Sequence, residues 1–172
     1  MQTAKQIIQI LLYEGGSMKK EDLVKFLSIK KDEVENNILE IENLLAVLDL
    51  RLIKNVTSLE ISLSLEMNSL INKNKIEELK SDLSESALQT LGVILYKNKS
   101  TKAEIDFIRG VDSSRSLKNL LTRGIIEKVE EKSRKYYFPT TETLRYLNVD
   151  SVEKIADFTV ISDKLRELIQ GE

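Results

Sequence analysis

The sequence contains 28 Asp and Glu residues but no His and no Cys. Carboxylates are therefore its main candidates for acid–base chemistry, and several occur in adjacent pairs. Pairs such as Asp32–Glu33 and Glu130–Glu131 could act as a general acid and base. We expect them instead to lie in solvent, since charge runs usually face water. The pair Gly15–Gly16 fits neither a phosphate loop nor a dinucleotide fingerprint. Without His and Cys the commonest metal ligands and nucleophiles are missing, so we predict no enzyme, no metal site and no cofactor.

Basic side chains offer a second kind of chemistry, which is contact with phosphate. Residues 84–150 carry 12 basic and 9 acidic residues, whereas residues 1–83 carry 11 basic and 14 acidic residues. The candidates for phosphate contact therefore lie in the second half: Arg115, Lys118, Arg123, Arg134 and Lys135. The corresponding helix of the first half is acidic and should be repelled by phosphates. A solvated basic face that balances an acidic half is the other interpretation.

The elements that position these cations are predicted to be three helices followed by a β-hairpin, over residues 84–149. Thr101 and Glu104 form a capping box, which starts the second helix. Gly110 ends that helix, because glycine accepts the left-handed backbone of a helix end. Residues 125–138 predict two strands around a polar tip. This order of elements is that of a winged helix.

The first half repeats the second at a shift of 82 residues. Leu23 then meets Ile105, and Ile38 meets Leu120. The run 59–65 alternates apolar and polar residues, as a half-buried strand does. We predict a mostly α chain with small β-hairpins (α+β), built as two tandem winged-helix domains and joined by a helix over residues 66–80. The predicted parts are an N-terminal winged-helix domain (1–80), a C-terminal winged-helix domain (84–150) and a tail that could hold a short helix (151–172).

The first helix is richer in apolar residues than one buried face requires. All residues of Ile7–Leu12 except Gln9 are large and apolar. Such a run covers more of the helix circumference than a single core-facing stripe. We expect part of this surface, with Ile7, Ile8, Ile10 and Leu11 as the candidates, to meet the following domain, a second copy of the chain or a partner helix. The alternative is that the linking helix covers this surface within the chain.

Aromatic residues gather in the second half, at Phe107, Tyr136, Tyr137, Phe138 and Tyr146. Tyr136 and Phe138 share one strand face and Tyr137 takes the other. We therefore expect at least one exposed aromatic side chain, which is typical of a binding hot spot. The alternative is a tyrosine packed at the base of the hairpin with its hydroxyl in water.

Three motifs in the second half carry a family resemblance. They are Ile-Arg-Gly-Val-Asp at 108–112, Leu-Leu-Thr-Arg-Gly at 120–124 and Phe-Pro-Thr-Thr at 138–141. Together they resemble the segregation and condensation protein B (ScpB) family. The first two motifs match that family's pattern outright, and the third has Pro139 where the family has Gly. The resemblance in layout covers most of the chain.

The resemblance implies a non-enzymatic scaffold subunit of the SMC–kleisin complex for chromosome condensation and segregation. It further implies a homodimer that forms through the first domain, at Ile7, Ile8, Ile10 and Leu11. This dimer would bind the kleisin ScpA through the second domain. The SMC ATPase and DNA would then be reached only through that kleisin. The candidate kleisin-binding or motif residues are Arg109, Gly110, Val111, Asp112, Tyr136, Tyr137, Thr140 and Thr141.

A tandem winged-helix DNA-binding transcription regulator is the alternative function, since winged helices often place their third helix in the major groove. Both functions predict the same compartment. The apolar run Ile7–Leu12 is too short to cross a bilayer. We therefore expect a cytoplasmic, nucleoid-associated protein without membrane contact.

Overall fold

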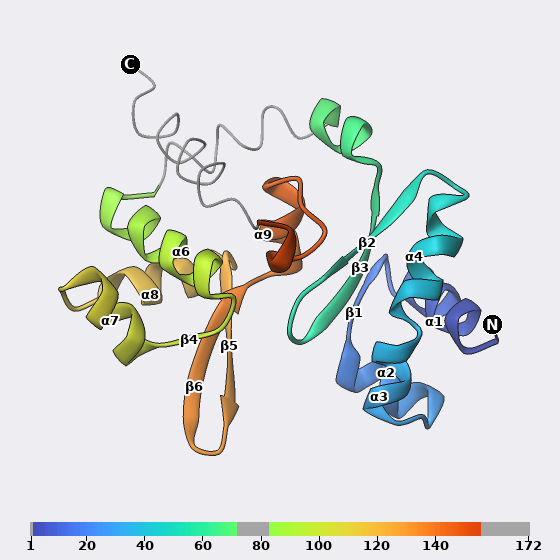
Figure 1. The fold of residues 1–172 in the computed structure, drawn as a ribbon, viewed down its shortest axis with the longest axis horizontal. Helices are drawn as coiled ribbons and strands as arrows, with labels where there is room; N and C mark the ends of the chain where they lie inside the picture. Colours follow the sequence, from blue (N-terminus) through green and yellow to red (C-terminus); the bar gives the residue numbers. More distant parts are fainter. Residues whose placement is uncertain (1, 72–82, 156–172) are drawn as a thin grey trace. The chain divides into compact units, whose positions relative to one another are not determined.

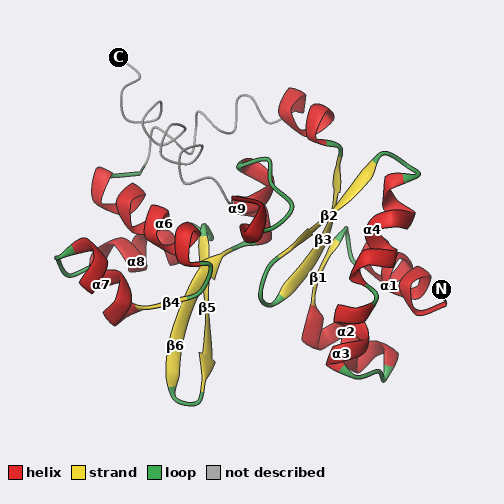
Figure 2. Cartoon of the chain, viewed as in Figure 1, coloured by secondary structure: helices red, strands yellow, loops and turns green. Residues whose placement is uncertain are grey.

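The computed structural model describes residues 2–71 and 83–155 (Figure 1). The chain splits into two compact units, residues 1–71 and residues 72–172. Within the described residues each unit combines helices with a three-stranded antiparallel sheet, as Figure 2 shows. The predicted α+β class is therefore confirmed.

The first unit has a helix, a short strand, three more helices and a hairpin. Its elements are α1 (Gln2–Tyr13), β1 (Ser17–Lys19), α2 (Lys20–Leu27), α3 (Lys31–Asn36), α4 (Ile38–Ala46), β2 (Leu50–Lys54) and β3 (Ser58–Leu63). The strand order in the sheet is β1-β3-β2. Its buried core is aliphatic: Ala4, Ile7, Leu11, Leu23, Val34, Ile41, Leu45, Leu52 and Leu59. Residues 65–71 are helical, and the rest of the predicted linking helix lies outside the described residues.

The second unit repeats this order. Its elements are α6 (Glu85–Lys97), β4 (Ser100–Thr101), α7 (Lys102–Arg109), α8 (Ser114–Thr122), β5 (Ile126–Glu131), β6 (Arg134–Pro139), α9 (Thr141–Tyr146) and the 3-10 turn η1 (Val152–Ile155). The strand order is β4-β6-β5. The core is formed by Ala87, Leu91, Ile94, Leu95, Ile105, Leu117, Leu120, Ile125, Ile126 and Tyr137. The short helix suggested within the tail, over 163–170, lies outside the described residues.

Both units thus show the winged-helix order, and the tandem repeat is confirmed. Two features were not predicted. Each sheet has a third strand, because β1 pairs with β3 at Ser17–Glu60 and β4 pairs with β6 at Ser100–Tyr137. These strands are too short to show an alternating pattern in the sequence. In addition, the third helix of the first unit is divided at Asn37 into α3 and α4.

The local signals in the second unit behave as predicted. Thr101 and Glu104 form both hydrogen bonds of the capping box at the start of α7. Gly110 ends α7 with a φ of 69°, in the left-handed region that glycine tolerates. The hairpin closes at Lys132 and Ser133, which both have positive φ. Two left-handed residues in a two-residue turn match the twist of the flanking strands, so this hairpin keeps a tight turn without glycine.

Candidate protein-binding surfaces

Helix α1 uses two of the predicted interface residues for its own core. Ile7 and Leu11 are completely buried, together with Ala4, because these positions lie on one face at helical spacing. Their assignment to a dimer interface is corrected: neither can meet a second copy while the unit is folded. Ile8 and Ile10 are half-buried and pack against the same core. They border the core and keep part of their surface in solvent.

The exposed apolar surface of the first unit comes from other positions. At the end of α1, Tyr13 is 84% exposed and Leu12 is also exposed. Further exposed large apolar side chains lie on or next to α2 and α4: Phe26, Leu39, Val47 and Leu48. Large exposed apolar side chains that gather on a small domain mark candidate contact sites. Helix α1 therefore does have more apolar surface than its core needs, but the solvent-exposed part of that surface lies at the end of the helix.

Arg109 of the 108–112 motif joins three helices. Its guanidinium donates a hydrogen bond to the Ser86 hydroxyl at 2.9 Å and to the Gln89 side-chain oxygen at 3.4 Å. The Ser86 hydroxyl is also 2.9 Å from that of Ser116. Since these residues belong to α6, α7 and α8, Arg109 fixes the end of α7 against both neighbours. The structure thus gives Arg109 a packing role within the unit.

Asp106 and Asp112 hold the turn between α7 and α8. The Lys102 ammonium donates to Asp106 at 2.5 Å and to Asp112 at 2.6 Å. Asp106 also accepts hydrogen bonds from the backbone and hydroxyl of Ser113, and Asp112 accepts two from Ser114. The hydrogen bonds from Lys102 and then Ser113 lower the pKa of Asp106 to about 2. A carboxylate in this position is therefore a structural group, held ionised by its donors.

Replacement of Asp106 by Asn should lower the free energy of unfolding by about 1–2 kcal/mol at neutral pH, because charge-assisted hydrogen bonds are lost. The pKa of Asp106 is lowered in the folded chain, so its contribution is complete above its ordinary pKa of 3.8 and is lost as the pH falls towards 2. Urea unfolding at neutral pH and at acid pH measures both effects. The variant should differ least from the wild type at the lowest pH. Glu130→Gln, on the exposed part of the hairpin, is the control; an equal loss for both variants would contradict this role of Asp106.

The Thr140–Thr141 motif caps a helix. The Thr140 hydroxyl accepts from the backbone N–H of Thr143 and lies 2.9 Å from the carbonyl of Gly124, to which it donates. The Thr143 hydroxyl donates to the carbonyl of Ile125 at 2.7 Å. Thr141 is buried. These bonds tie the start of α9 to the segment between α8 and β5, so the motif stabilises the fold of the unit.

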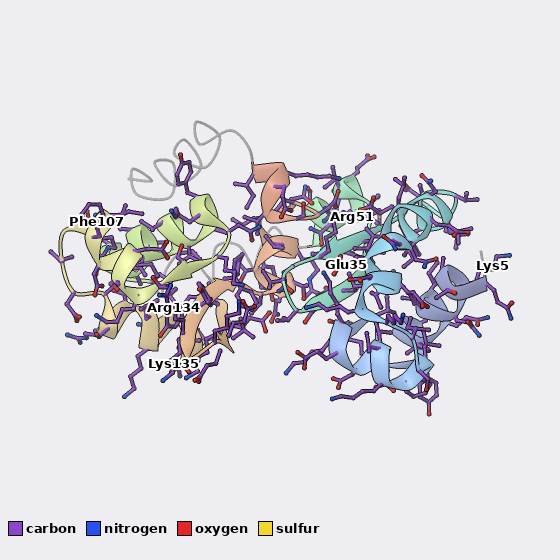
Figure 3. The ribbon with its side chains drawn as sticks, turned by 60° about the horizontal axis from the view of Figure 1, so that its bottom comes forward. Lys5, Glu35, Arg51, Phe107, Arg134 and Lys135 are labelled. Atoms are coloured by element: carbon purple, nitrogen blue, oxygen red, sulfur yellow. The ribbon has the colours of Figure 1, made fainter. Side chains whose placement is uncertain are left out.

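The strand aromatics are less accessible than predicted. Tyr137 is 9% exposed and belongs to the core, and Phe138 is completely buried. Tyr136 is half-buried, with the Lys99 ammonium 4.4 Å from its ring centroid. Burial removes Tyr137 from the residues that a partner can reach in the folded unit. Among the five aromatics singled out in the sequence, Phe107 on α7 is the exposed one, at 89%, and Figure 3 labels it.

The sequence contains a signal for the exposure of Phe107. The capping box fixes where α7 begins, and Ile105 is its buried residue. A residue two positions further along a helix lies about 200° around the axis, so Phe107 must point away from the core. Strand alternation predicts an exposed aromatic on β6, but the last three residues of that strand are all buried.

All five candidate phosphate contacts are exposed: Arg115, Lys118, Arg123, Arg134 and Lys135. Those on the hairpin face carboxylates across the strands, because Lys135 is paired in register with Glu130 and Arg134 with Glu131. Helix α8 contains no acidic residue. Its positive side chains therefore have no carboxylate neighbour on their own helix, unlike those of the hairpin.

The residues that the structure describes contain no group of three His, Cys, Asp or Glu side chains able to hold a metal ion. Within the same residues, no helix is long and apolar enough to span a bilayer.

Residues 5–158 match the family model described as segregation and condensation complex subunit ScpB. The chain belongs to the ScpB family. Two members show the level of similarity. ScpB of Clostridium botulinum (strain Kyoto / Type A2) is 29% identical over 98% of this chain and 89% of its own length. ScpB of Lactobacillus delbrueckii subsp. bulgaricus is 32% identical over 91% of this chain and 81% of its own length.

A solved ScpB structure, from Mycobacterium tuberculosis, is 19% identical, with a TM-score of 0.37 over 84% of this chain and 94% of that one. The description of the matching family model names a subunit of a segregation and condensation complex. In this ScpB chain, the family-like motifs at 108–112 and 138–141 mainly hold the second unit together. Ile108 and Val111 of the first motif differ from its other residues, because both are exposed apolar side chains.

Proposed function

We propose that this chain is a non-enzymatic scaffold subunit of an SMC–kleisin complex, and that it binds the kleisin ScpA as a homodimer. Family membership supports the complex. The structural observation that supports the scaffold role is exposed apolar surface on units whose cores are already complete. Tyr13 in the first unit and Phe107 in the second are each more than four-fifths exposed, at 84% and 89%. Such side chains are typical of protein contacts.

The first unit is the proposed dimerisation unit. Leu12 and Tyr13 would supply the exposed centre of the contact, and Ile8 and Ile10 its half-buried margin. Burying large apolar side chains of this kind against a second copy removes apolar area from water at roughly 25 cal/mol per Å². This surface replaces the one centred on Ile7 and Leu11.

The second unit is the proposed kleisin-binding unit. In this arrangement ATP hydrolysis belongs to the SMC ATPase, and the chain reaches both the ATPase and DNA through the kleisin. The chain's own task is to shape the kleisin. It would carry out that task in the cytoplasm, at the nucleoid.

DNA binding by the second unit is a second candidate, favoured by one observation. Helix α8 carries Arg115 and Lys118 on its exposed side and has no acidic residue. In the first unit the equivalent region is acidic, and Glu42 is paired with Lys54 at 2.7 Å. A regulator that uses α8 should bind a defined duplex with an affinity that falls by about 0.9 log units per log unit of salt for each phosphate contacted.

Size-exclusion chromatography with light scattering separates the two functions. The full chain alone should elute with twice the mass of one copy. Mixed with the central region of the kleisin from the same genome, it should co-elute as a stable complex, and it should bind a short DNA duplex weakly near physiological salt. A monomeric chain that ignores the kleisin but binds duplex DNA would overturn the scaffold proposal in favour of the regulator.

A further inference from the structure

Helix α8 turns one polar, positively charged side to solvent, which we call the α8 face. The residues of this face follow one another at spacings of three and four along the helix and so share one side of it: Arg115, Lys118, Asn119, Thr122 and Arg123. Helical spacing holds to the end of this row, because Arg123 keeps right-handed helical backbone angles at the C-cap. The other side of α8 is used for packing, since Leu117 and Leu120 belong to the core.

Two cations of the α8 face are available to an anion. Arg115 and Lys118 are exposed, and within the described part of the chain neither takes part in an ion pair. The carboxylate that precedes them, Asp112, is held by Lys102 at 2.6 Å and by Ser114. An anion that approaches from solvent can therefore reach both cations without displacing a carboxylate.

The composition of the α8 face separates one class of anionic partner from the others. Helix α8 lies wholly within the described residues, and none of its large apolar side chains is exposed. An acidic protein helix or a membrane surface needs apolar contact as well as charge. A nucleic-acid backbone needs only cations and hydrogen-bonding groups. The α8 face therefore fits a row of phosphates.

The length of the α8 face suits a B-form duplex. Arg115 and Arg123 are separated by about 12 Å along the helix axis, at 1.5 Å per residue. The major groove of B-DNA is also about 12 Å wide and admits an α-helix. Cations at both ends of the face can thus lie near the phosphates that border the groove. The major groove of an RNA duplex is deep and narrow, so the same helix does not enter it.

The side chains between the cations are poorly placed to read bases. Asn119 is half-buried in its own unit. The Thr122 hydroxyl donates a hydrogen bond to the Lys118 carbonyl at 2.9 Å. Sequence is read by side chains that hydrogen-bond to base edges, whereas phosphate contacts carry no sequence information directly. The α8 face therefore offers phosphate contacts with little means of base recognition.

The first unit provides an internal comparison, because it has the same fold. At the shift of 82 residues, Arg115 corresponds to Glu33, which is exposed, and Thr122 corresponds to Glu40. The first unit also divides this helix at Asn37. The two copies thus differ in charge at the helix that a winged helix places against DNA. Only the second copy has the charge that phosphates attract.

We propose that the α8 face binds the phosphate backbone of duplex DNA directly and without reading its sequence. Arg115 and Lys118 contact phosphates, and Arg123 extends the row. This inference goes beyond the proposed scaffold function, in which the chain reaches DNA only through the kleisin. It also differs from the transcription regulator, because no defined duplex is preferred. Each copy of the chain adds a weak contact to DNA that the complex holds.

Fluorescence anisotropy of a short labelled DNA duplex, titrated with the full chain at several salt concentrations, tests this assignment. The wild-type dissociation constant should be roughly 10⁻⁴ to 10⁻⁶ M near physiological salt, and equal for a second duplex of unrelated sequence. The double variant Arg115→Glu with Lys118→Glu should bind about tenfold more weakly at low salt. Its slope of log affinity against log salt should be shallower by about two, because each lost phosphate contact removes about one. Glutamate is tolerated near a helix N-terminus, so circular dichroism should show a wild-type fold.

A matched control reverses two cations of the first unit. The double variant Lys5→Glu with Lys30→Glu changes the net charge by the same amount at exposed positions, and Figure 3 labels Lys5. It should keep the wild-type salt slope.

Four results would overturn the proposal. Equal weakening by both double variants would mean that net charge alone attracts DNA. The other three are no binding of any duplex at low salt, equal affinity for an RNA duplex, and a strong preference for one of the two DNA sequences, which would favour the regulator. Co-elution with the kleisin is measured separately, so a failure here leaves the scaffold function standing.

Discussion

Replacing Ile7 with Asp should unfold the first unit, whereas replacing Tyr13 with Asp should leave it folded and turn a dimer into a monomer. Ile7 is completely buried, so the change removes a core side chain and places an unpaired carboxylate in an apolar interior. The first loss alone costs about 2–5 kcal/mol and the second adds several more. Domains of this size have only about 5–15 kcal/mol of stability. Tyr13 is exposed, so its replacement should disturb only the proposed contact between copies.

Circular dichroism with urea denaturation and light scattering measure these outcomes together. Lys5→Asp, an exposed position on the same helix that Figure 3 labels, is the control and should change neither stability nor mass. A folded but monomeric Ile7→Asp variant would place Ile7 at the interface. The packing of α1 described above would then be wrong.

Replacing Ile105 with Ala should destabilise the second unit by about 2–5 kcal/mol, while Ile108→Ala should change its stability by less than about 1 kcal/mol. The two residues have the same side chain and lie on the same short helix. Ile105 is completely buried among Ile94, Leu117 and Leu120, so its truncation leaves a cavity. Ile108 is half exposed, so little packing is lost.

Urea unfolding followed by hydrogen exchange assigns the loss to a unit. Amides of α6, α7 and α8 should exchange faster in Ile105→Ala, and amides of α1 and α4 should keep their protection. Equal destabilisation by both substitutions would contradict this division of α7 into a buried and an exposed side.

Local features were predictable because a few neighbouring residues determine them. The capping box at Thr101 and Glu104 and the end of α7 at Gly110 follow from hydrogen bonds and backbone freedom within one helical turn. The repeat was visible because both units need apolar residues at equivalent positions, such as Leu23 and Ile105. The winged-helix order follows from these elements and from the short connections between them.

Tertiary structure decided which apolar side chains remain free. The run Ile7–Leu12 predicts a helix with surplus apolar surface, but only packing assigns Ile7 and Leu11 to the core and leaves Leu12 in solvent. Strand alternation separates the faces of Tyr136 and Tyr137, yet it cannot show that helices cover one face and bury Tyr137. The charged motif residues have structural roles for the same reason, because Asp112 reaches Lys102 only when the turn after Gly110 folds back beside α7. Spacing along the chain fixes which side chains share a face, and only the packed neighbours determine whether that face meets water.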